Sequence, residues 1–275
     1  MSERIDVLIP TYNRPDALAV TLTSLINQTD QNFRVIISDQ TPERSIGEAR
    51  LVSTTMKVLA YQGHSVELHR HIPSIGMAEQ RNFLLEQSSA PYVLFLDDDL
   101  ILESRVIENL RATIEKEQCG FVGCAVIGLS YLDDIRPEEQ AIELWNGPVE
   151  PEEVLPDTPA WERYKLHNAA NLAHVQNRLG LTIQHPRPYK VAWVGGCVLY
   201  HAEKLRSVGG FSFWQELPPQ HSGEDVLAQL RVMRKFGGCG LIPSGVYHQE
   251  LPTQVPVRDV DAPRVLSIAP FTEAH

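Results

Sequence analysis

Short apolar runs alternate with segments of helical periodicity over the first 128 residues, and this alternation constrains the fold more than any other feature of the chain. The apolar runs have the length of strands and lie at residues 5–10, 33–38, 65–70, 92–96 and 121–128. The segments of helical periodicity lie at residues 14–28, 46–59, 76–88 and 104–117. Strands that alternate with helices of this length form a largely parallel sheet covered by helices on both faces. The sequence therefore predicts an α/β fold with a doubly wound sheet.

Polar side chains follow three of these apolar runs. They are Pro10 to Arg14, Asp39, and the three consecutive aspartates Asp97, Asp98 and Asp99. In open α/β sheets, ligands bind beyond the carboxyl ends of the strands, so we expect these residues to share one crevice. Asp is also common in turns and at helix caps, and that alternative stays open for Asp39. Three consecutive caps serve no purpose, which favours a functional role for the three aspartates.

The remainder of the chain differs from this first part. Residues 133–184 are rich in Glu, Pro, Trp and Asn, and we expect one helix in this acidic stretch, from Trp161 to Leu179. The last twenty or so residues are expected to form an extended tail and to serve as an interaction arm. We divide the chain into an α/β half (1–127), a second half with a helical insertion (128–250) and a C-terminal tail (251–275).

Composition and charge exclude several classes of protein. The chain has 275 residues, is 43% hydrophobic and carries a net charge of −11, which argues against nucleic acid and anionic membranes as general partners. No apolar run reaches the roughly 20 residues that a membrane-spanning helix needs, and the charged N-terminus is not typical of a secretory signal. The cysteines lack CxxC spacing and are expected to be reduced thiols; they are Cys119, Cys124, Cys197 and Cys239. We expect a cytoplasmic protein, with peripheral contact at the inner membrane face left open.

The three aspartates interrupt the apolar stretch YVLFLDDDLIL, from Tyr92 to Leu102. Adjacent carboxylates repel one another unless a positive group lies between them. Carboxylate oxygens at a strand end suit Mg²⁺ or Mn²⁺, which such sites commonly share with substrate phosphates. If the extended geometry persists, Asp97 and Asp99 face one side and Asp98 the other. The stretch therefore predicts a D-x-D site with Asp97 and Asp99 at the ligand.

Longer stretches of the chain resemble the family 2 glycosyltransferases of GT-A fold. The run from DVLIPTYNRPDA at Asp6 to LDDDLIL at Leu102 is similar to the nucleotide-sugar half of that family. The segments WVGGCVLYHAEKLRSVGGF and GEDVLAQLRV are similar to its acceptor-side glycine segment and its E-D catalytic motif. The resemblance covers about residues 4–250. It implies a Rossmann-like, mostly parallel sheet flanked by helices, with an acceptor-side lobe.

The resemblance also implies a role for each matching position. The nucleotide-sugar pocket would be lined by Pro10, Thr11, Arg14, Asp39, Arg81, Asp97 and Asp98. Within it, Asp39 would accept a hydrogen bond from the base, and Arg81 would approach the base or the diphosphate. Asp99 would ligate a divalent cation, Mn²⁺ or Mg²⁺. His248 lies where some relatives place a further metal ligand. Asp225, with Glu224 beside it, would be the general base for the acceptor hydroxyl.

Four further residues are assigned to the acceptor and sugar side: Trp193, Gly195, Gly196 and Trp214. The two glycines would allow the backbone to approach a sugar closely, and the tryptophans would stack on a sugar face. Structural alternatives stay open for several positions. The GED segment is also typical of a helix N-terminus, WVGGC of a tight strand, and a lone histidine such as His248 of a structural residue. Large aromatic side chains are core residues at least as often as they are ligands.

Two departures from the family pattern narrow the function. Many relatives carry D-D-G-S after the second strand, where this chain reads SDQT with Gln40 at the second acidic position, so the identity of the base stays open. The Q-x-x-R-W signature of processive synthases is absent. This absence favours transfer of a single sugar over chain extrusion.

The leading hypothesis is an inverting, metal-dependent glycosyltransferase that moves one sugar from a nucleoside diphosphate sugar to a hydroxyl acceptor. The family suggests a surface glycan or a glycolipid as acceptor, and we expect the acidic lobe (133–184) to determine its choice. A sugar nucleotidyltransferase is one alternative, but it usually has a glycine-rich basic loop that IPTYNRPDA lacks. An inactive nucleotide-sugar-binding protein is the other, and the presence of Asp99 together with GED counts against it.

Overall fold

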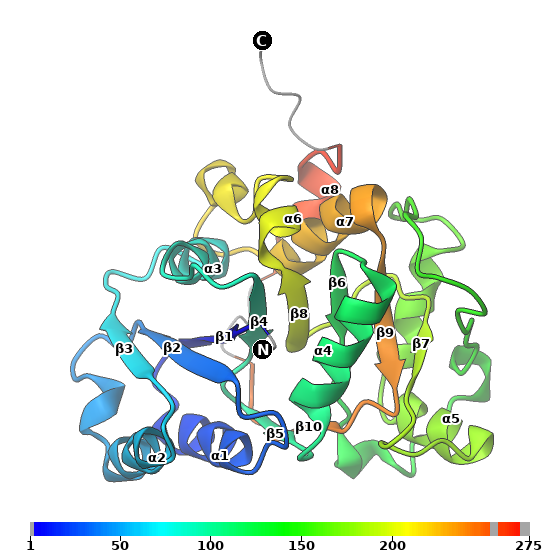
Figure 1. Cartoon of the computed structure of the whole chain (residues 1–275). Coiled ribbons are helices and arrows are strands. Elements are labelled where there is room, and N and C mark those ends of the chain that lie inside the picture. The colour runs from blue at the N-terminus through cyan, green and yellow to red at the C-terminus, as the bar shows by residue number, and fades with distance from the viewer. Residues whose placement is uncertain (1–2, 254–257, 270–275) are drawn as a thin grey trace.

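A single sheet of eight strands runs through both halves of the chain (Figure 1). The computed structural model describes residues 3–253 and 258–269. The strand order is β3-β2-β1-β4-β8-β6-β9-β7. The strands of this sheet are β1 (Ile5–Thr11), β2 (Phe33–Asp39), β3 (Val66–Arg70), β4 (Tyr92–Leu96), β6 (Phe121–Gly123), β7 (Arg187–Tyr189), β8 (Cys197–His201) and β9 (Gly238–Ile242). Two short strands, β5 (Leu100–Leu102) and β10 (Val246–His248), form a separate antiparallel pair.

The first four strands of the sheet are parallel, as the alternation of strands and helices predicts. β1 pairs with β2 and β4, and β2 pairs with β3, all in parallel register. All seven residues of β1 are buried, because the strand lies in the middle of a sheet that is covered on both faces. The second half is mixed, since β8 runs antiparallel to both β4 and β6, and β7 runs antiparallel to β9. Because β1 and β4 are parallel neighbours, their carboxyl ends lie side by side.

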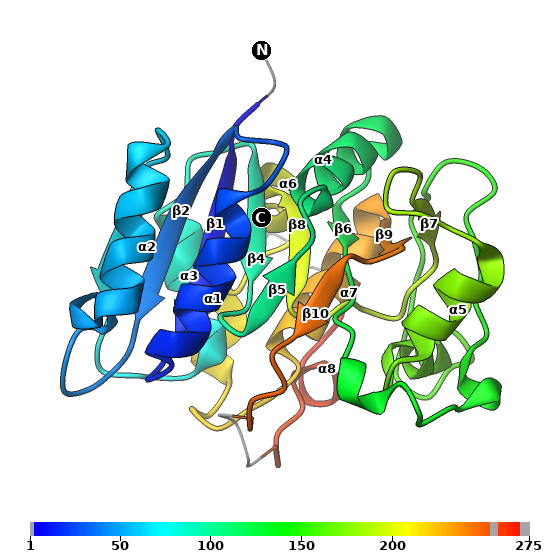
Figure 2. The ribbon, with the colours of Figure 1, turned by 90° about the horizontal axis from the view of Figure 1, so that it is seen from below.

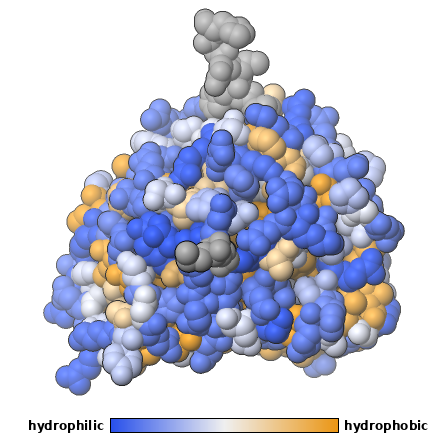
Figure 3. Space-filling model, in the orientation of Figure 1, coloured by the Kyte–Doolittle hydropathy of each residue, from blue (hydrophilic) through white to orange (hydrophobic). Residues whose placement is uncertain are grey.

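Helices cover both faces of the sheet and enclose two apolar cores (Figures 1 and 2). One face carries α1 (Pro15–Ile26), α2 (Arg50–Tyr61) and α4 (Val106–Glu117), and the other carries α3 (Met77–Glu86), α6 (Ala202–Arg206) and α7 (Glu224–Phe236). The remaining helices are α5 (Asn171–Leu179), α8 (Ala262–Val265) and the 3₁₀ turns η1 (Ile46–Glu48), η2 (Leu129–Tyr131), η3 (Pro137–Glu139), η4 (Trp161–His167) and η5 (Ser212–Glu216). The surface seen in Figure 3 is mainly hydrophilic, with scattered hydrophobic side chains.

The structure corrects three sequence-based boundaries. The helix predicted at 161–179 is two elements, η4 and α5, and the chain turns between them at Ala169, which has a positive φ of 47°. Asn171 stabilises this turn, because its side-chain amide donates to the carbonyl of Lys165. The helix predicted from Ile46 begins as the short turn η1, and the strand predicted at 121–128 ends at Gly123.

The described part of the C-terminal segment is packed against the rest of the protein and is not an extended arm. Residues 258–269 include α8, in which Ala262 is fully buried. Arg264 forms an ion pair with Asp157, and Arg231 of α7 donates to the carbonyl of Ser267. The rest of the predicted tail, residues 254–257 and 270–275, lies outside the described residues. Among the described helices, none has both the length and the apolar character required to cross a membrane.

Candidate active site

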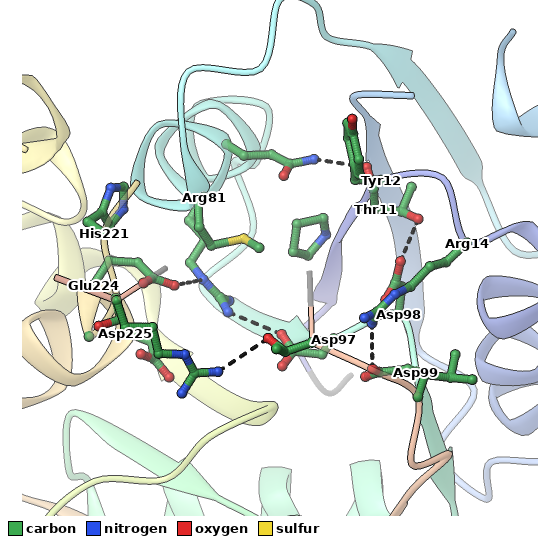
Figure 4. A pocket seen from close by; sticks show the side chains of 18 of the residues that line it. Thr11, Tyr12, Arg14, Arg81, Asp97, Asp98, Asp99, His221, Glu224 and Asp225 are labelled. Atoms are coloured by element: carbon green, nitrogen blue, oxygen red, sulfur yellow. Dashed lines mark hydrogen bonds and ion pairs between the residues drawn. The ribbon is translucent and has the colours of Figure 1, made fainter. Parts of the chain in front are cut away.

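A cavity of about 490 Å³ lies where the carboxyl ends of β1 and β4 meet the first turn of α7 (Figure 4). Ten of the residues predicted from the sequence line it: Pro10, Thr11, Arg14, Arg81, Asp97, Asp98, Asp99, Glu224, Asp225 and His248. These residues come from five separate segments of the chain. The fold therefore brings together the strand-end residues and the GED segment, which are more than 100 positions apart in sequence.

Two arginines pair with the three aspartates. Arg14 donates from Nη1 to Asp99 Oδ2 at 2.6 Å and lies 3.6 Å from Asp98 Oδ1. On the other side, Arg81 donates from Nη2 to Asp97 Oδ1 at 3.1 Å. Each arginine compensates the repulsion that neighbouring carboxylates would otherwise exert, because an opposite charge within about 4 Å favours the ionised form. The positive groups that the sequence requires between the aspartates are thus supplied by the protein itself.

The three aspartates do not continue β4 in extended geometry. The strand ends at Leu96, and Asp98 and Asp99 form a turn before β5 begins at Leu100. The expectation that Asp98 faces away from Asp97 and Asp99 is therefore wrong, and all three carboxylates line the same cavity. Thr21 stabilises the turn, since its hydroxyl oxygen accepts from the amide of Leu100 at 3.0 Å.

Arg81 connects the strand-end aspartates to α7. Its Nε donates to Glu224 Oε1 at 3.1 Å, while its Nη2 bonds to Asp97, and its side chain is only 7% exposed. Burial disfavours the guanidinium charge, but the carboxylates of Asp97, Glu224 and Asp225 outweigh this effect and raise the pKa of Arg81. A buried guanidinium that holds two carboxylates in a fixed geometry positions both walls of the cavity.

Asp225 has a perturbed carboxylate next to this ion pair. Burial raises its pKa to about 7, and the negative charge of Glu224 adds to the effect, while Arg81 opposes it. Its Oδ1 accepts from the backbone amide of Val226 at 2.9 Å. A carboxylate with a pKa near 7 in a cavity has the proton affinity that a general base needs at neutral pH.

Asp98 is buried and bonds to the end of β1. Its side chain accepts a hydrogen bond of 2.6 Å from the hydroxyl of Thr11, the last residue of β1. Burial raises the pKa of Asp98 to about 7, and Thr11 and Arg14 partly offset that rise. This bond joins the ends of the two strands that form the floor of the cavity.

Asp99 and His248 have the donor atoms for a divalent cation. Asp99 Oδ2 and His248 Nε2 lie 3.5 Å apart, close to the roughly 3 Å separation of two ligands on one ion with bonds of about 2.1 Å. Arg14 bonds to the same oxygen of Asp99, so a cation here would compete with it. No group of three or more His, Cys, Asp or Glu suited to a metal occurs in the described ranges. The pair fits a Mg²⁺ or Mn²⁺ that takes its other ligands from water and substrate phosphates.

Several predicted residues lie outside this cavity. Asp39 is fully buried, and its carboxylate accepts from the backbone amides of Thr41 at 2.9 Å and Ile46 at 2.7 Å. This supports the turn alternative that the sequence leaves open for Asp39, because its oxygens stabilise the loop that follows β2.

The acceptor-side residues also differ from the expectation. Trp193 packs on Trp161 and Tyr164, with ring centroids 4.5 Å and 5.3 Å away, and Trp214 packs against the same core, so neither lines the cavity. Gly196 has a φ of +80°, and a Cβ there would lie 2.6 Å from Val126 and 3.5 Å from Asp97. The absence of a side chain at Gly196 therefore leaves room for Val126 and Asp97, whereas a Cβ at Gly195 would meet no atom within 4 Å.

Other lining residues of the cavity had no individual role predicted from the sequence: Tyr12, Met77, Gln80, His221, Ser222, Gly223, Leu251, Thr253 and Arg258. His221 has a clear structural role, because its Nε2 accepts from the backbone amide of Ala78 at 3.1 Å. This bond satisfies one of the free amides at the start of α3 and joins α3 to the segment before α7. The position of His221, three residues before Glu224, was the signal in the sequence that could have identified it.

Comparison with known proteins places the chain in a family. The model of the family described as Glycosyl transferase family 2 matches residues 6–170. An uncharacterized glycosyltransferase of Haemophilus influenzae is 31% identical over 149 residues, which are 50% of this chain and 47% of that protein. The Escherichia coli enzyme WfgD, named UDP-Glc:alpha-D-GlcNAc-diphosphoundecaprenol beta-1,3-glucosyltransferase, is 23% identical over 118 residues, 43% of this chain and 44% of that protein. The chain covers less than half of the length of either relative.

Solved structures agree with this assignment at the level of the fold. The crystal structure of residues 1–349 of S. aureus TarS in complex with UDP-GlcNAc has a TM-score of 0.53 and 16% sequence identity, and covers 92% of this chain and 60% of that one. The family model covers more than half of the chain, and its matched region contains β1, β4 and the three aspartates of the cavity. The chain therefore belongs to glycosyl transferase family 2.

Proposed function

We propose that this protein transfers a single sugar from a nucleoside diphosphate sugar to a hydroxyl group of an acceptor, with inversion at the anomeric carbon. The observation that carries the proposal is the composition of one cavity. Asp225, whose pKa is raised to about 7, shares this cavity with the three strand-end aspartates and with Arg14 and Arg81. The cavity thus contains a group that can accept a proton and groups suited to a diphosphate with its cation.

The residues of the chain divide the work between donor and acceptor. Pro10 and Thr11 would contact the nucleoside at the end of β1, and Arg14 would bind a phosphate oxygen when the diphosphate enters. Asp225 would take the proton of the acceptor hydroxyl as it attacks the anomeric carbon, on the face opposite the diphosphate, and this direction of attack inverts the centre. Glu224 would act through Arg81, by keeping the guanidinium in place next to Asp97.

Asp99 and His248 are the residues that would hold a divalent cation, Mg²⁺ or Mn²⁺. When bound, such a cation acts as a Lewis acid that stabilises negative charge on the departing diphosphate. The donor types and their separation of 3.5 Å support this assignment.

The acceptor class is proposed from the relatives. WfgD is named for a diphosphoundecaprenol-linked acceptor, and TarS was crystallised with UDP-GlcNAc. We propose by analogy that this chain uses a nucleoside diphosphate sugar and acts in the synthesis of a surface glycan or a glycolipid. The base and the sugar of the donor are left to experiment.

Thermal unfolding against a panel of nucleoside diphosphates, each with and without Mn²⁺, tests the donor site. A ligand that binds only the folded state raises the melting temperature by mass action, and about 100-fold excess over its Kd corresponds to roughly 2.7 kcal/mol. We expect one diphosphate to stabilise the protein in a metal-dependent way, and EDTA to remove the effect.

Two variants make this test specific. Asp99→Ala should abolish the metal-dependent shift, whereas Asp133→Ala, at an exposed carboxylate that does not line the cavity, should retain it. If no diphosphate shifts the melting temperature of the wild-type protein under any metal condition, the proposed donor site is wrong.

A further inference from the structure

A second cavity, of about 340 Å³, adjoins the first. His248 and Leu251 line both cavities and form the partition between them. The other walls of the second cavity are Val126, Gly128, Tyr131, Arg136, Ala169 and Glu250. A molecule bound there would be next to the site in which donor and general base are proposed to meet.

The polar groups of the second cavity suit the hydroxyl groups of a sugar. Both carboxylate oxygens of Glu250 accept from Ser130, one from its backbone amide at 2.9 Å and one from its hydroxyl, so the carboxylate is held in place. Nε of Arg136 donates hydrogen bonds of 3.1 Å to both carboxylate oxygens of Asp134, and these bonds orient the guanidinium. The carboxylate of Glu250 can accept hydrogen bonds from sugar hydroxyl groups, and the guanidinium of Arg136 can donate to them. The ring of Tyr131 offers a face on which a sugar ring can stack.

The charge around this cavity disfavours an anionic ligand. Arg136 lines this cavity, and its guanidinium is already paired with Asp134 and lies 3.5 Å from Glu139. Glu250 contributes a further carboxylate. A phosphate or an anionic membrane surface would meet net negative charge here, whereas an uncharged sugar would not.

Two residues of the wall have a conformation that is rare for residues other than glycine. Ala169 has a φ of 47° and Glu250 a φ of 59°. Backbone in this region is strained for residues other than glycine, and it is concentrated at ligand sites, where the surrounding structure maintains it. Both residues line the second cavity.

An exposed apolar loop borders the second cavity. Leu129, Leu132 and Ile135 are 48%, 42% and 62% exposed, and they flank Tyr131, which lines the cavity. We call these three residues the apolar rim. Single exposed apolar residues are ordinary, but three within seven positions beside a cavity offer apolar surface to a hydrocarbon chain.

We propose that the second cavity binds the acceptor, and that this acceptor is an uncharged sugar attached to a hydrocarbon chain that lies along the apolar rim. This inference rests on the proposed function, because it assigns the acceptor side of the same reaction. The sugar occupies the cavity between Tyr131, Arg136 and Glu250, and its reactive hydroxyl points past His248 toward the first cavity. The chain extends over Leu129, Leu132 and Ile135.

The test uses methyl and octyl glycosides matched in their sugar, for glucose, galactose and N-acetylglucosamine, all below the micellar concentration. Binding to the full-length protein is measured by saturation-transfer NMR and titration calorimetry. We expect at least one octyl glycoside to bind 10-fold or more tightly than its methyl partner. The triple variant Leu129→Ser/Leu132→Ser/Ile135→Ser should lower this ratio to about 1, whereas Tyr131→Ala should weaken both partners at least 5-fold.

A matched control excludes a general effect of exposed apolar residues. Leu51, Val58 and Tyr61 on α2 are 59%, 39% and 94% exposed, and replacing all three by Ser should leave the octyl to methyl ratio unchanged. An unchanged ratio in the rim variant, or equal loss in both triple variants, would overturn the proposal. So would a rim-dependent association with phosphatidylglycerol vesicles in the absence of octyl glycoside binding, because it would indicate a bilayer as the occupant.

Failure of this inference can be distinguished from failure of the proposed function. Nucleoside diphosphate binding in the presence of Mn²⁺ involves the first cavity, and the rim variant should retain it. A rim variant that retains diphosphate binding while the wild type binds no octyl glycoside overturns only the acceptor assignment. Rim-dependent glycoside binding without any diphosphate binding supports the second cavity and contradicts the proposed donor.

Discussion

Asp225 is the residue on which the proposed chemistry depends most directly. In the Asp225→Asn variant the side chain keeps its size but cannot accept the acceptor proton, so we expect turnover to fall by about 10²–10⁴-fold. Binding of the nucleoside diphosphate, which involves the opposite side of the cavity, should change less than 3-fold. Product formation and calorimetric binding would be measured on the same preparation. Full turnover by the variant would show that another group is the base.

The raised pKa of Asp225 also predicts how stability depends on pH. Its pKa rises from the ordinary value of 3.8 to about 7 on folding, so between these values the folded state binds more protons than the unfolded state. Stability from this group is therefore present at low pH and is lost as the pH rises from about 4 to 7. Activity should change in the opposite direction, rising as the carboxylate ionises near pH 7.

Urea unfolding at several pH values would check this sign. Asp225→Asn should remove part of the decline in unfolding free energy between pH 4 and 7. Asp133→Asn, at an exposed carboxylate, serves as control and should leave the slope of the wild type unchanged. A slope that is the same in wild type and Asp225→Asn would show that Asp225 titrates normally.

Arg81 is expected to couple Glu224 to Asp97 energetically. Arg81→Gln leaves two carboxylates without their cation, and breaking a buried ion pair in this way costs about 3–5 kcal/mol. The double variant Arg81→Gln/Glu224→Gln also removes one of the unpaired charges. It should be less destabilised than the sum of the two single variants, and chemical denaturation of all four proteins would measure this coupling. Additive effects would mean that the pair does not interact.

At the scale of elements, the start of α7 depends on one glycine. Gly223 has a φ of +76°, and a Cβ there would lie 2.3 Å from Asp261 Oδ1 and 2.8 Å from Pro263 Cδ. Gly223→Ala should destabilise the protein by about 2–4 kcal/mol, through backbone strain and this overlap, and should displace Glu224 and Asp225 enough to lower turnover.

Gly180 provides the matched control for this effect. Its φ is +62°, but a Cβ there would meet no atom within 4 Å. Gly180→Ala should therefore cost only the backbone strain of about 1–2 kcal/mol and leave activity intact. Melting temperatures and turnover of the two variants would separate strain from overlap. Equal losses in both would show that contact with the C-terminal segment does not matter.

The agreement between sequence and structure is closest for elements in the parallel half. β1, β2 and β4 lie within one residue of their predicted ranges, because a strand buried on both faces must be a continuous apolar run. The region 133–184 was predicted less well. Its break at Ala169 depends on side-chain bonds to residues such as Lys165 and Glu139, and periodicity does not carry that information.

At the scale of the whole molecule, the C-terminal segment closes one side of the site. Ala262 is fully buried, Ile268 is 9% exposed, and Asp261 contacts the loop before α7. A chain that ends at Thr253 loses this packing and should be less stable by about 2–5 kcal/mol. A chain that ends at Ala269 keeps all the described contacts and serves as control. Urea denaturation would compare the two, and equal stability would show that the segment contributes nothing.

The sequence by itself determined the chemistry available at the site and the first half of the sheet. The three aspartates after a buried strand and the GED segment are recognised directly in the sequence. In an alternating α/β pattern the carboxyl ends of the parallel strands must lie at the same edge of the sheet. Six of the predicted residues line one cavity for this reason: Pro10, Thr11, Arg14, Asp97, Asp98 and Asp99.

Only the tertiary structure decided which cations pair with the aspartates of the site and which predicted residues are buried in the core instead of lining the cavity. The pairing of Arg14 and Arg81 with the aspartates, the burial of Asp39, and the core positions of Trp193 and Trp214 depend on contacts between residues far apart in the chain. The raised pKa of Asp225 has the same origin, because it results from burial and from neighbours on other elements. Burial and Coulomb interactions depend on distance in space, and a linear sequence does not contain that distance.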